Sequence, residues 1–350
     1  MTFDERMMRR CFQLAQKGLG NVAPNPMVGA IVCCGEDIIG EGYHQKWGEP
    51  HAEVNAINSV GNKDLLKEST LYVNLEPCSH FGKTPPCADL IIKMGIPKVV
   101  ISNLDPNPKV AGRGVQRLRD AGVEVIVDVL KNEGNFLNRR FFTFYSLKRP
   151  YIILKWAKTL DGFMDIYDRF ENRNQQYWIT NAELKQWVHK WRSEESGIMI
   201  GAHTALNDNP TLNVREWIGN NPTRIVLAKN VELPSHLNVF NKESKTILFT
   251  SKSCDFDNSN VKTVLLEHDD FTQENVLKSL YDLDIQSLIV EGGKELLQSF
   301  IDFGLWDEAR VLTGNKKFEK GLKAPLMAEK AVTTLEINDN WCEFYYNNIV

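Results

Sequence analysis

With 350 residues, the chain is longer than a single hydrophobic core usually supports, so we expect two domains. Contents of 43% hydrophobic and 25% charged residues are typical of globular proteins. The net charge of −4 gives no general attraction for nucleic acid, and no apolar run approaches the ~18 residues of a membrane span. Seven cysteines without regular spacing, and a start that lacks the apolar core of a signal peptide, predict a cytoplasmic protein without a disulfide framework.

The N-terminal half predicts alternating helices and strands. Thr2 and Glu5 form a capping box that begins the first helix, and a Gly-containing turn at 35–37 joins two apolar runs as a hairpin. We expect helices at 2–18, 51–60, 87–94 and 115–120, and strands at 27–34, 38–42, 71–75, 99–103 and 123–127. This alternation predicts an α/β sandwich with a partly parallel sheet.

An aromatic-rich segment, 132–148, predicts one helix that closes the first domain. We place the domain boundary at Lys148-Arg149-Pro150, with the first domain at 1–147 and the second at 150–350. The second half again alternates. We expect strands at 151–156, 198–201, 224–227, 246–250, 261–266 and 287–290, helices at 181–192, 271–283 and 294–303, and an outer strand at 341–346.

A histidine and two cysteines form the most specific pattern of the chain. His51, Cys78 and Cys87 offer three of the four ligands of tetrahedral zinc, and the fourth position is left for water, as in catalytic sites. Glu53 lies two residues after His51 and can move protons without binding the metal. The order H-x-E followed by Pro-Cys is typical of zinc-dependent base deaminases. In that chemistry the metal lowers the pKa of its water, while the glutamate passes protons to a ring nitrogen and the departing amine.

Two alternatives apply to this region. A structural zinc would need a fourth protein ligand, which His44 or His80 offers, but Glu53 would then have no task. The spacer of eight residues between the cysteines replaces the usual two and contains His80, Lys83 and Thr84. Such side chains suit a phosphate, whereas the ordinary interpretation is a polar surface loop.

The pieces APNPMVGA, GEGYHQKWGEPHAE and LEPCSHFGKTPPC resemble the bifunctional deaminase–reductase family of riboflavin biosynthesis and, more loosely, the cytidine deaminase superfamily. The pieces KWAKTLDG, WIT, GAHTALNDNPTLNVR and VEGGKEL resemble the reductase domain of the same family, which is similar in fold to dihydrofolate reductase. The resemblance implies a three-layer α/β/α deaminase domain and an α/β reductase domain that depends on NADPH. It also implies the deaminase substrate, a diaminopyrimidinone ribosylamino 5′-phosphate, whose deaminated product is then reduced at its ribosyl chain.

The resemblance further implies which residues form the two sites. Zinc would be bound by His51, Cys78 and Cys87, with Glu53 as the proton carrier. The deaminase substrate would contact Asn25, His44, His80, Lys83, Thr84, Asp105 and Asn107. An amide such as Asn25 can pair with a ring edge, although a turn residue between two prolines is an equal alternative.

The reductase residues follow from the resemblance in the same way. The cofactor would contact Lys158, Trp178, Thr204, Asp208, Gly293, Lys294 and Glu295, and the substrate would contact Lys155, Gln176, Arg192, Leu212, Arg215 and Glu291. The Gly-Gly pair at 292–293 fits a phosphate near a helix start, whereas no GxGxxG motif follows a strand. Lys158 and Gln176 depart from the small residue and the serine that the family leads us to expect, and 165–175 resembles a charged insertion.

Two hypotheses therefore remain for the second half. The first is an NADPH-dependent reductase whose phosphorylated pyrimidine comes from the first domain. The second is a non-redox domain that binds substrate or RNA, against which the negative charge counts. We expect a homo-oligomer formed through the reductase domain.

Overall fold

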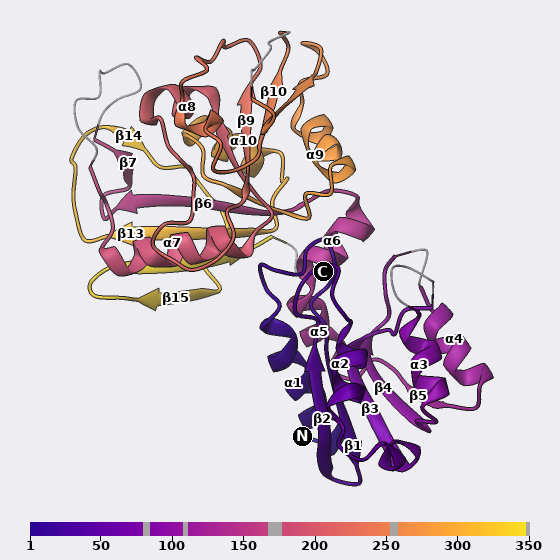
Figure 1. The fold of residues 1–350 in the computed structure, drawn as a ribbon. Helices are drawn as coiled ribbons and strands as arrows, with labels where there is room; N and C mark the ends of the chain where they lie inside the picture. The colour runs from indigo at the N-terminus through magenta and orange to yellow at the C-terminus, as the bar shows by residue number, and fades with distance from the viewer. Residues whose placement is uncertain (80–84, 108–110, 167–176, 253–257, 348–350) are drawn as a thin grey trace. The chain divides into compact units, whose positions relative to one another are not determined.

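The computed structural model divides the chain into an N-terminal unit, Met1–Lys148, and a C-terminal unit, Arg149–Val350, each described by itself (Figure 1). The structure describes residues 1–79, 85–107, 111–166, 177–252 and 258–347. Four predicted site residues lie outside these ranges: His80, Lys83, Thr84 and Gln176. Among the described residues, no helix has the length and apolar character needed to cross a membrane.

The N-terminal unit contains a five-stranded sheet in the order β2-β1-β3-β4-β5. The strands are β1 (Gly29–Cys34), β2 (Asp37–Tyr43), β3 (Ser69–Leu75), β4 (Lys98–Asn103) and β5 (Glu124–Ile126). β1 pairs antiparallel with both β2 and β3, whereas β3, β4 and β5 are parallel. The partly parallel sheet expected from the sequence is therefore confirmed.

Helices cover both faces of this sheet and form three layers. α1 (Phe3–Gln16) and α5 (Lys131–Leu137) pack on one face; α2 (Ala52–Ser59), α3 (Cys87–Lys93) and α4 (Arg113–Asp120) pack on the other (Figure 1). Side chains of β1 alternate between these faces, with Ile31 towards α1 and Val32 towards α2. A short 3₁₀ helix, Lys63–Glu68, precedes β3. The predicted capping box is present, because the Glu5 backbone N–H donates to the Thr2 hydroxyl at 3.2 Å.

The prediction of one helix at 132–148 is wrong, because the chain forms α5 and then α6 (Arg139–Leu147), with a break at Asn138. The Asn138 side chain is 3% exposed and binds the backbone of Met27 twice: its Oδ1 accepts from the N–H and its Nδ2 donates to the carbonyl, both at 2.9 Å. A buried amide with two partners outside the helix favours the break over a continuous helix. It also fixes the loop that leads into β1.

The C-terminal unit contains a nine-stranded sheet in the order β11-β10-β9-β8-β12-β6-β13-β16-β15. Its strands are β6 (Tyr151–Thr159), β8 (Gly197–Gly201), β9 (Thr223–Ala228), β10 (Thr246–Thr250), β11 (Val261–Leu265), β12 (Ser287–Val290), β13 (Glu308–Gly314), β15 (Thr333–Glu336) and β16 (Trp341–Tyr346). The strands from β11 to β13 in this order are parallel, and β16 and β15 complete the sheet in antiparallel pairings.

Two predictions for this sheet need correction. The segment 341–346 is not the outer strand, because β15 pairs along its free edge. The sequence analysis also missed β13, which is buried along its whole length between β6 and β16. Its charged residues, Glu308 and Arg310, hid its strand character, but they pair with each other at 2.6 Å and are almost fully buried.

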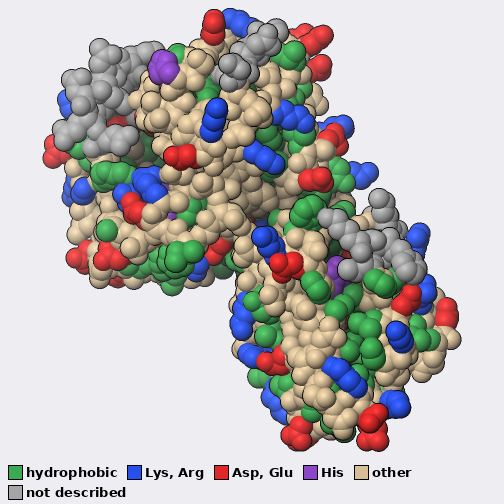
Figure 2. Space-filling model, in the orientation of Figure 1, with side chains coloured by type: hydrophobic (Ala, Val, Ile, Leu, Met, Phe, Trp, Pro, Cys, Tyr) green, Lys and Arg blue, Asp and Glu red, His purple; other side chains and the backbone are tan. Residues whose placement is uncertain are grey.

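Helices again pack on both faces of the sheet. α9 (Gln273–Asp282) and α10 (Lys294–Asp302) cover one face, and α7 (Ala182–Glu194) and α8 (Ala202–Asp208) cover the other. α7 begins as predicted, since the Asn181 side chain accepts the Leu184 N–H at 3.0 Å. A small antiparallel pair, β7 (Phe163–Asp165) with β14 (Leu322–Lys323), and a 3₁₀ turn, Asn238–Phe240, complete the unit. On the face drawn in Figure 2, acidic and basic side chains are interspersed over both units.

Two candidate active sites

The predicted zinc ligands meet at one end of the sheet in the N-terminal unit. His51 is the N-cap of α2, Cys78 follows β3, and Cys87 is the first residue of α3. The His51 Nδ1 lies 3.6 Å from the Cys78 Sγ and 3.4 Å from the Cys87 Sγ, and all three ligand atoms lie within 4.8 Å of one another.

These separations fit zinc. A tetrahedral ion with bonds of about 2.1–2.3 Å holds its ligand atoms about 3.4–3.8 Å apart. Cys78 already receives the backbone N–H of Cys87 at 3.3 Å. Its pKa is lowered to about 4 through its hydrogen bonds with Cys87 and His51, which favours the thiolate that zinc binds. The three residues can therefore hold the metal without moving far.

Glu53 lies on the first turn of α2 and is 3% exposed. Burial raises the pKa of its carboxyl group, which interacts with the Cys87 thiol. A buried carboxyl group with a raised pKa beside a metal site suits proton transfer.

His44 lies next to this cluster but outside it. Its Nδ1 lies 3.1 Å from the carbonyl oxygen of Pro50, so this nitrogen carries the proton and the Nε2 can accept from the Asn25 amide, 3.1 Å away. Burial lowers the pKa of His44, in keeping with a neutral ring. Because both ring nitrogens are engaged, His44 does not serve as a fourth ligand, and the cluster found among the described residues contains three.

Asp105 and Asn107 lie on the loop after β4. The Asn107 backbone N–H donates to the Asp105 carboxylate at 2.8 Å. Burial raises the pKa of Asp105 to about 6, and the nearby negative charge of the Cys78 thiolate adds to this increase. The loop therefore lies on the metal side of the sheet.

Glu76, a buried carboxylate immediately before Pro77-Cys78, is not among the site residues predicted from the sequence. It is 4% exposed and accepts four backbone N–H groups, so it lies in the site without facing solvent. The available signal was a charged residue at the end of a predicted strand, where a buried carboxylate needs hydrogen-bond partners.

In the C-terminal unit, three predicted substrate residues form a buried ionic cluster. Arg192 binds Glu291 through two hydrogen bonds, at 3.0 and 2.7 Å, and the Lys155 ammonium lies 3.6 Å from the same carboxylate. Burial alone would raise the pKa of Glu291, but Arg192 and Lys155 outweigh it and lower the pKa to about 2. Burial also lowers the pKa of Lys155. These residues come from β6, from α7 and from the end of β12, and Arg192 and Glu291 are 99 positions apart.

One face of α7 holds the segment that carries Arg215. Lys185 pairs with Glu216 at 2.6 Å, His189 accepts the Arg215 backbone N–H at 3.3 Å, and Arg192 donates to the Asn213 carbonyl at 3.3 Å. The predicted contact Leu212, by contrast, is 4% exposed and belongs to the hydrophobic core. The Arg215 side chain is half-exposed and lies 3.9 Å from the Glu216 carboxylate.

The predicted cofactor residues do not all meet. The Gly293 N–H donates to the Thr204 hydroxyl at 3.0 Å, which joins the start of α10 to α8. Asp208 is the last residue of α8, and Glu295 is exposed on the first turn of α10. Trp178 is 53% exposed and lies towards α7, since the Lys185 ammonium is 4.3 Å from its ring centroid.

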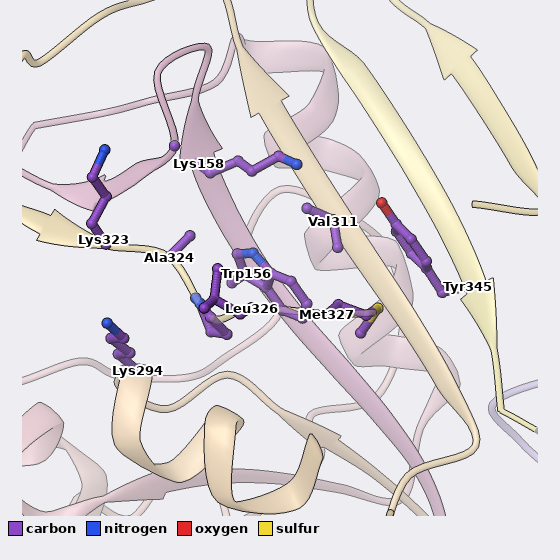
Figure 3. Close-up of a pocket in the computed structure, with 11 residues that line it drawn as sticks. Trp156, Lys158, Lys294, Val311, Lys323, Ala324, Leu326, Met327 and Tyr345 are labelled. Atoms are coloured by element: carbon purple, nitrogen blue, oxygen red, sulfur yellow. The ribbon is translucent and has the colours of Figure 1, made fainter. Parts of the chain in front are cut away.

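Lys158 and Lys294 line one cavity of about 640 Å³ on the α10 face of the sheet (Figure 3). Figure 3 shows Trp156 in the middle of the lining residues, with Lys158, Lys294 and Lys323 around it. The other lining residues are mostly apolar: Gly162, Val311, Ala324, Pro325, Leu326, Met327 and Tyr345. Trp156 is 4% exposed, and its indole N–H has no hydrogen-bond partner among the described residues. Lys158 reaches Glu343 at 3.2 Å, so its long side chain is accommodated where a small residue was expected.

The fold and the sites together define a two-domain enzyme. The N-terminal unit is a zinc-dependent deaminase domain of the cytidine deaminase type, and the C-terminal unit is a reductase domain. The family model "Cytidine and deoxycytidylate deaminase zinc-binding region" matches residues 1–103, and "RibD C-terminal domain" matches residues 150–318.

Similarity to relatives extends over almost the whole chain. The riboflavin biosynthesis protein RibD of Aquifex aeolicus (strain VF5) is 42% identical over 325 residues, which cover 91% of this chain and 89% of that protein. RibD of Escherichia coli (strain K12) is 36% identical over 330 residues, which cover 89% of this chain and 88% of that protein. The crystal structure of a diaminohydroxyphosphoribosylaminopyrimidine deaminase/5-amino-6-(5-phosphoribosylamino)uracil reductase from Thermotoga maritima is 39% identical, covers 99% of each chain and has a TM-score of 0.88.

The chain belongs to the RibD family. It is a bifunctional enzyme of riboflavin biosynthesis, with a deaminase domain that uses Zn²⁺ and a reductase domain that uses NADPH. The non-redox alternative for the second domain is not favoured.

Proposed function

We propose that the N-terminal unit deaminates 2,5-diamino-6-ribosylamino-4(3H)-pyrimidinone 5′-phosphate and that the C-terminal unit reduces the ribosyl chain of the product, 5-amino-6-(5-phosphoribosylamino)uracil. The observation that carries the first step is the His51, Cys78 and Cys87 cluster beside the buried Glu53. The named activities of the Thermotoga maritima relative support both substrates.

In the proposed deaminase mechanism, the side chains of the protein hold the metal, move protons and bind the substrate. His51, Cys78 and Cys87 would hold the zinc, which would supply an activated water for attack on the amino-bearing ring carbon. Glu53 would carry the two protons of that water in turn, the first to the ring nitrogen and the second to the departing amine, which leaves as ammonia. Asn25, held by His44, presents its remaining amide groups to the ring edge. Asp105, Asn107 and the spacer residues His80, Lys83 and Thr84 contact the rest of the substrate.

In the reductase unit, Arg192 and Arg215 attract the substrate phosphate. Glu291 orients Arg192, and Lys155, in the middle of β6 and 3.6 Å from the Glu291 carboxylate, would lie close to the reacting ribosyl carbon. NADPH, when bound, supplies a hydride. Gln176 would complete the substrate contacts, together with the backbone of Leu212, whose side chain is buried.

The cavity in Figure 3 accommodates part of NADPH. Lysines at its rim suit phosphate groups, the apolar wall suits a ring, and the Trp156 N–H can donate to a carbonyl. Lys158 and Lys294 belong to this cavity, and Gly293, Thr204, Asp208, Glu295 and Trp178 provide the remaining contacts. We expect Lys294→Gln to raise the KM for NADPH roughly tenfold, which corresponds to about 1.4 kcal/mol of binding, whereas the exposed Lys320→Gln leaves it unchanged. Equal KM values in the two variants would refute this placement.

The cellular location and the partners of the enzyme follow from the chemistry of its substrates. Free phosphorylated pyrimidines are cytoplasmic metabolites, so the enzyme works in the cytoplasm without nucleic acid, as the mixed surface charge also favours. The exposed edge strand β15 can pair with a second copy, which would give a homo-oligomer through the reductase unit.

A test of the deaminase step compares Glu53→Gln with the exposed Glu68→Gln. The first variant should keep its zinc but lose deaminase turnover by about 10²–10⁴-fold, and the second should behave as the unchanged protein. NADPH oxidation should occur only after deamination or with added deaminated product. Full deaminase turnover in Glu53→Gln, or no NADPH oxidation with the deaminated product, would refute the corresponding step.

A further inference from the structure

Glu76 is a carboxylate whose hydrogen-bonding capacity is filled by backbone donors. Its Oε1 accepts the N–H groups of Gly114 and Val115 at 2.8 and 3.1 Å, and its Oε2 accepts those of Gly112 and Asp105 at 2.9 and 3.2 Å. Three of the donors lie at the start of α4, where the helix dipole also favours an anion. These four donors satisfy the oxygens of the buried carboxylate.

The close approach of α4 to this carboxylate depends on Gly114. A Cβ atom at this position would lie 2.0 Å from the Pro77 carbonyl oxygen and 3.2 Å from the Glu76 Oε1. Only glycine therefore lets the helix start against the Glu76-Pro77-Cys78 segment. The contact between α4 and this segment therefore depends on two specific residues, the Glu76 carboxylate that accepts the hydrogen bonds and the glycine at 114 that permits the close approach.

The two segments joined by Glu76 carry different parts of the proposed site. One of them continues directly into Cys78, a ligand in the zinc cluster. The other contains Asp105, whose own backbone N–H is one of the four donors and whose side chain orients Asn107. A shift of the Glu76 carboxylate would therefore displace a metal ligand and a substrate-facing loop together.

We propose that Glu76 is a positioning residue of the deaminase, which couples the placement of Cys78 to that of the Asp105–Asn107 loop. This role rests on the proposed deaminase site. Glu76 touches neither metal nor substrate. It acts by holding two segments whose relative position determines both the geometry of the zinc cluster and the shape of the substrate site.

Glu76→Gln tests the role because it changes no volume. The amide nitrogen is a donor and must face one pair of backbone N–H groups, so half of the contacts become repulsive. We expect zinc content and NADPH-dependent reduction of the deaminated product to remain as in the unchanged protein, while deaminase kcat/KM falls about 10–100-fold. Both kcat and KM should change, because the ligand and the substrate loop move together. Glu76→Asp keeps the charge and should recover part of the loss.

The matched control is Asp89→Asn. Asp89 pairs with Arg117 and so links α3 to α4 through a partly exposed ion pair that does not involve Glu76. If this variant lowers deaminase turnover as much as Glu76→Gln does, the helix contact alone matters and the proposal is overturned. Wild-type kcat and KM in Glu76→Gln would also overturn it. So would loss of zinc with melting of the N-terminal unit in both Glu76 variants, since Glu76 would then serve folding alone. Failure of the unchanged chain to deaminate would instead refute the proposed function.

Discussion

Replacement of Glu291 by glutamine should destabilise the C-terminal unit more than most single substitutions. The change keeps the volume of the side chain but removes the negative charge that Arg192 and Lys155 share. Their side chains are only 12% and 15% exposed, so water cannot fully replace the lost partner. Two cations would remain close together in a poorly solvated site.

The size of the effect follows from the pKa of Glu291. It lies at about 2 instead of the usual 4.5, and at 1.36 kcal/mol for each pKa unit the difference corresponds to roughly 3 kcal/mol. Breaking a buried ion pair typically costs about 3–5 kcal/mol, in the same range. Lys155 can relieve part of this cost by losing its proton, because burial already lowers its pKa.

The pH dependence has a definite sign. The folded protein lowers the pKa of Glu291, so its stabilising effect is complete above pH 4.5 and is lost as the pH falls through about 2. The deficit of Glu291→Gln should therefore be largest near pH 7 and shrink over this window.

Urea unfolding followed by tryptophan fluorescence measures this effect. Seven of the eight tryptophans lie in the C-terminal unit, and only Trp47 lies in the other. The exposed Glu232→Gln serves as the control. A difference between the two variants below about 0.5 kcal/mol at pH 7, where ordinary surface changes fall, would refute the reasoning. So would a deficit that stays constant down to pH 3.

Three further predictions concern Asn138, His189 and the zinc ion. Asn138→Ala removes a hydrogen-bond partner of both the buried Met27 N–H and the Met27 carbonyl, so it should destabilise the N-terminal unit by about 2 kcal/mol and raise the deaminase KM. Thermal unfolding and steady-state kinetics measure these two effects, and an unchanged KM would contradict a role of Asn138 in placing the Asn25 loop. Burial and the nearby Arg192 and Arg215 lower the pKa of His189 to about 4, so the C-terminal unit should lose stability as the pH falls from 6.5 towards 4, and His189→Gln should flatten this dependence in unfolding curves. Removal of zinc by a chelator should abolish deaminase turnover and lower the melting temperature of the N-terminal unit while leaving NADPH oxidation intact; loss of both activities would contradict separate sites.

Much of the fold could be predicted because its signals are local. The capping box of Thr2 and Glu5, the turn at 35–37 and the N-cap Asn181 each lie within a few residues of the element they begin. The zinc cluster could be predicted equally well from the sequence, since His51, Cys78 and Cys87 lie where strands end or helices start. Their residue types alone limit the metal chemistry.

Features that depend on distant partners could not be predicted in this way. The sequence around Asn138 reads as one helix, because nothing nearby indicates that Met27, 111 positions away, binds its amide. β13 was missed because the pairing that makes Glu308 and Arg310 tolerable in a buried strand appears only after folding. Glu76 could not be singled out from the sequence, because its backbone donors at the start of α4 lie 38 and 39 positions away.

The sequence by itself determined the zinc chemistry, the two α/β units and the order of most of their elements, since these depend on residue type and short-range periodicity. Only the tertiary structure decided that Glu291 joins Lys155 to Arg192, that Asn138 divides a helix, and that Glu76 joins the segment before Cys78 to the loop of Asp105. The physical reason is the cost of burial. A buried charge or amide needs partners wherever in the chain they lie, and that requirement leaves no mark on the neighbouring sequence.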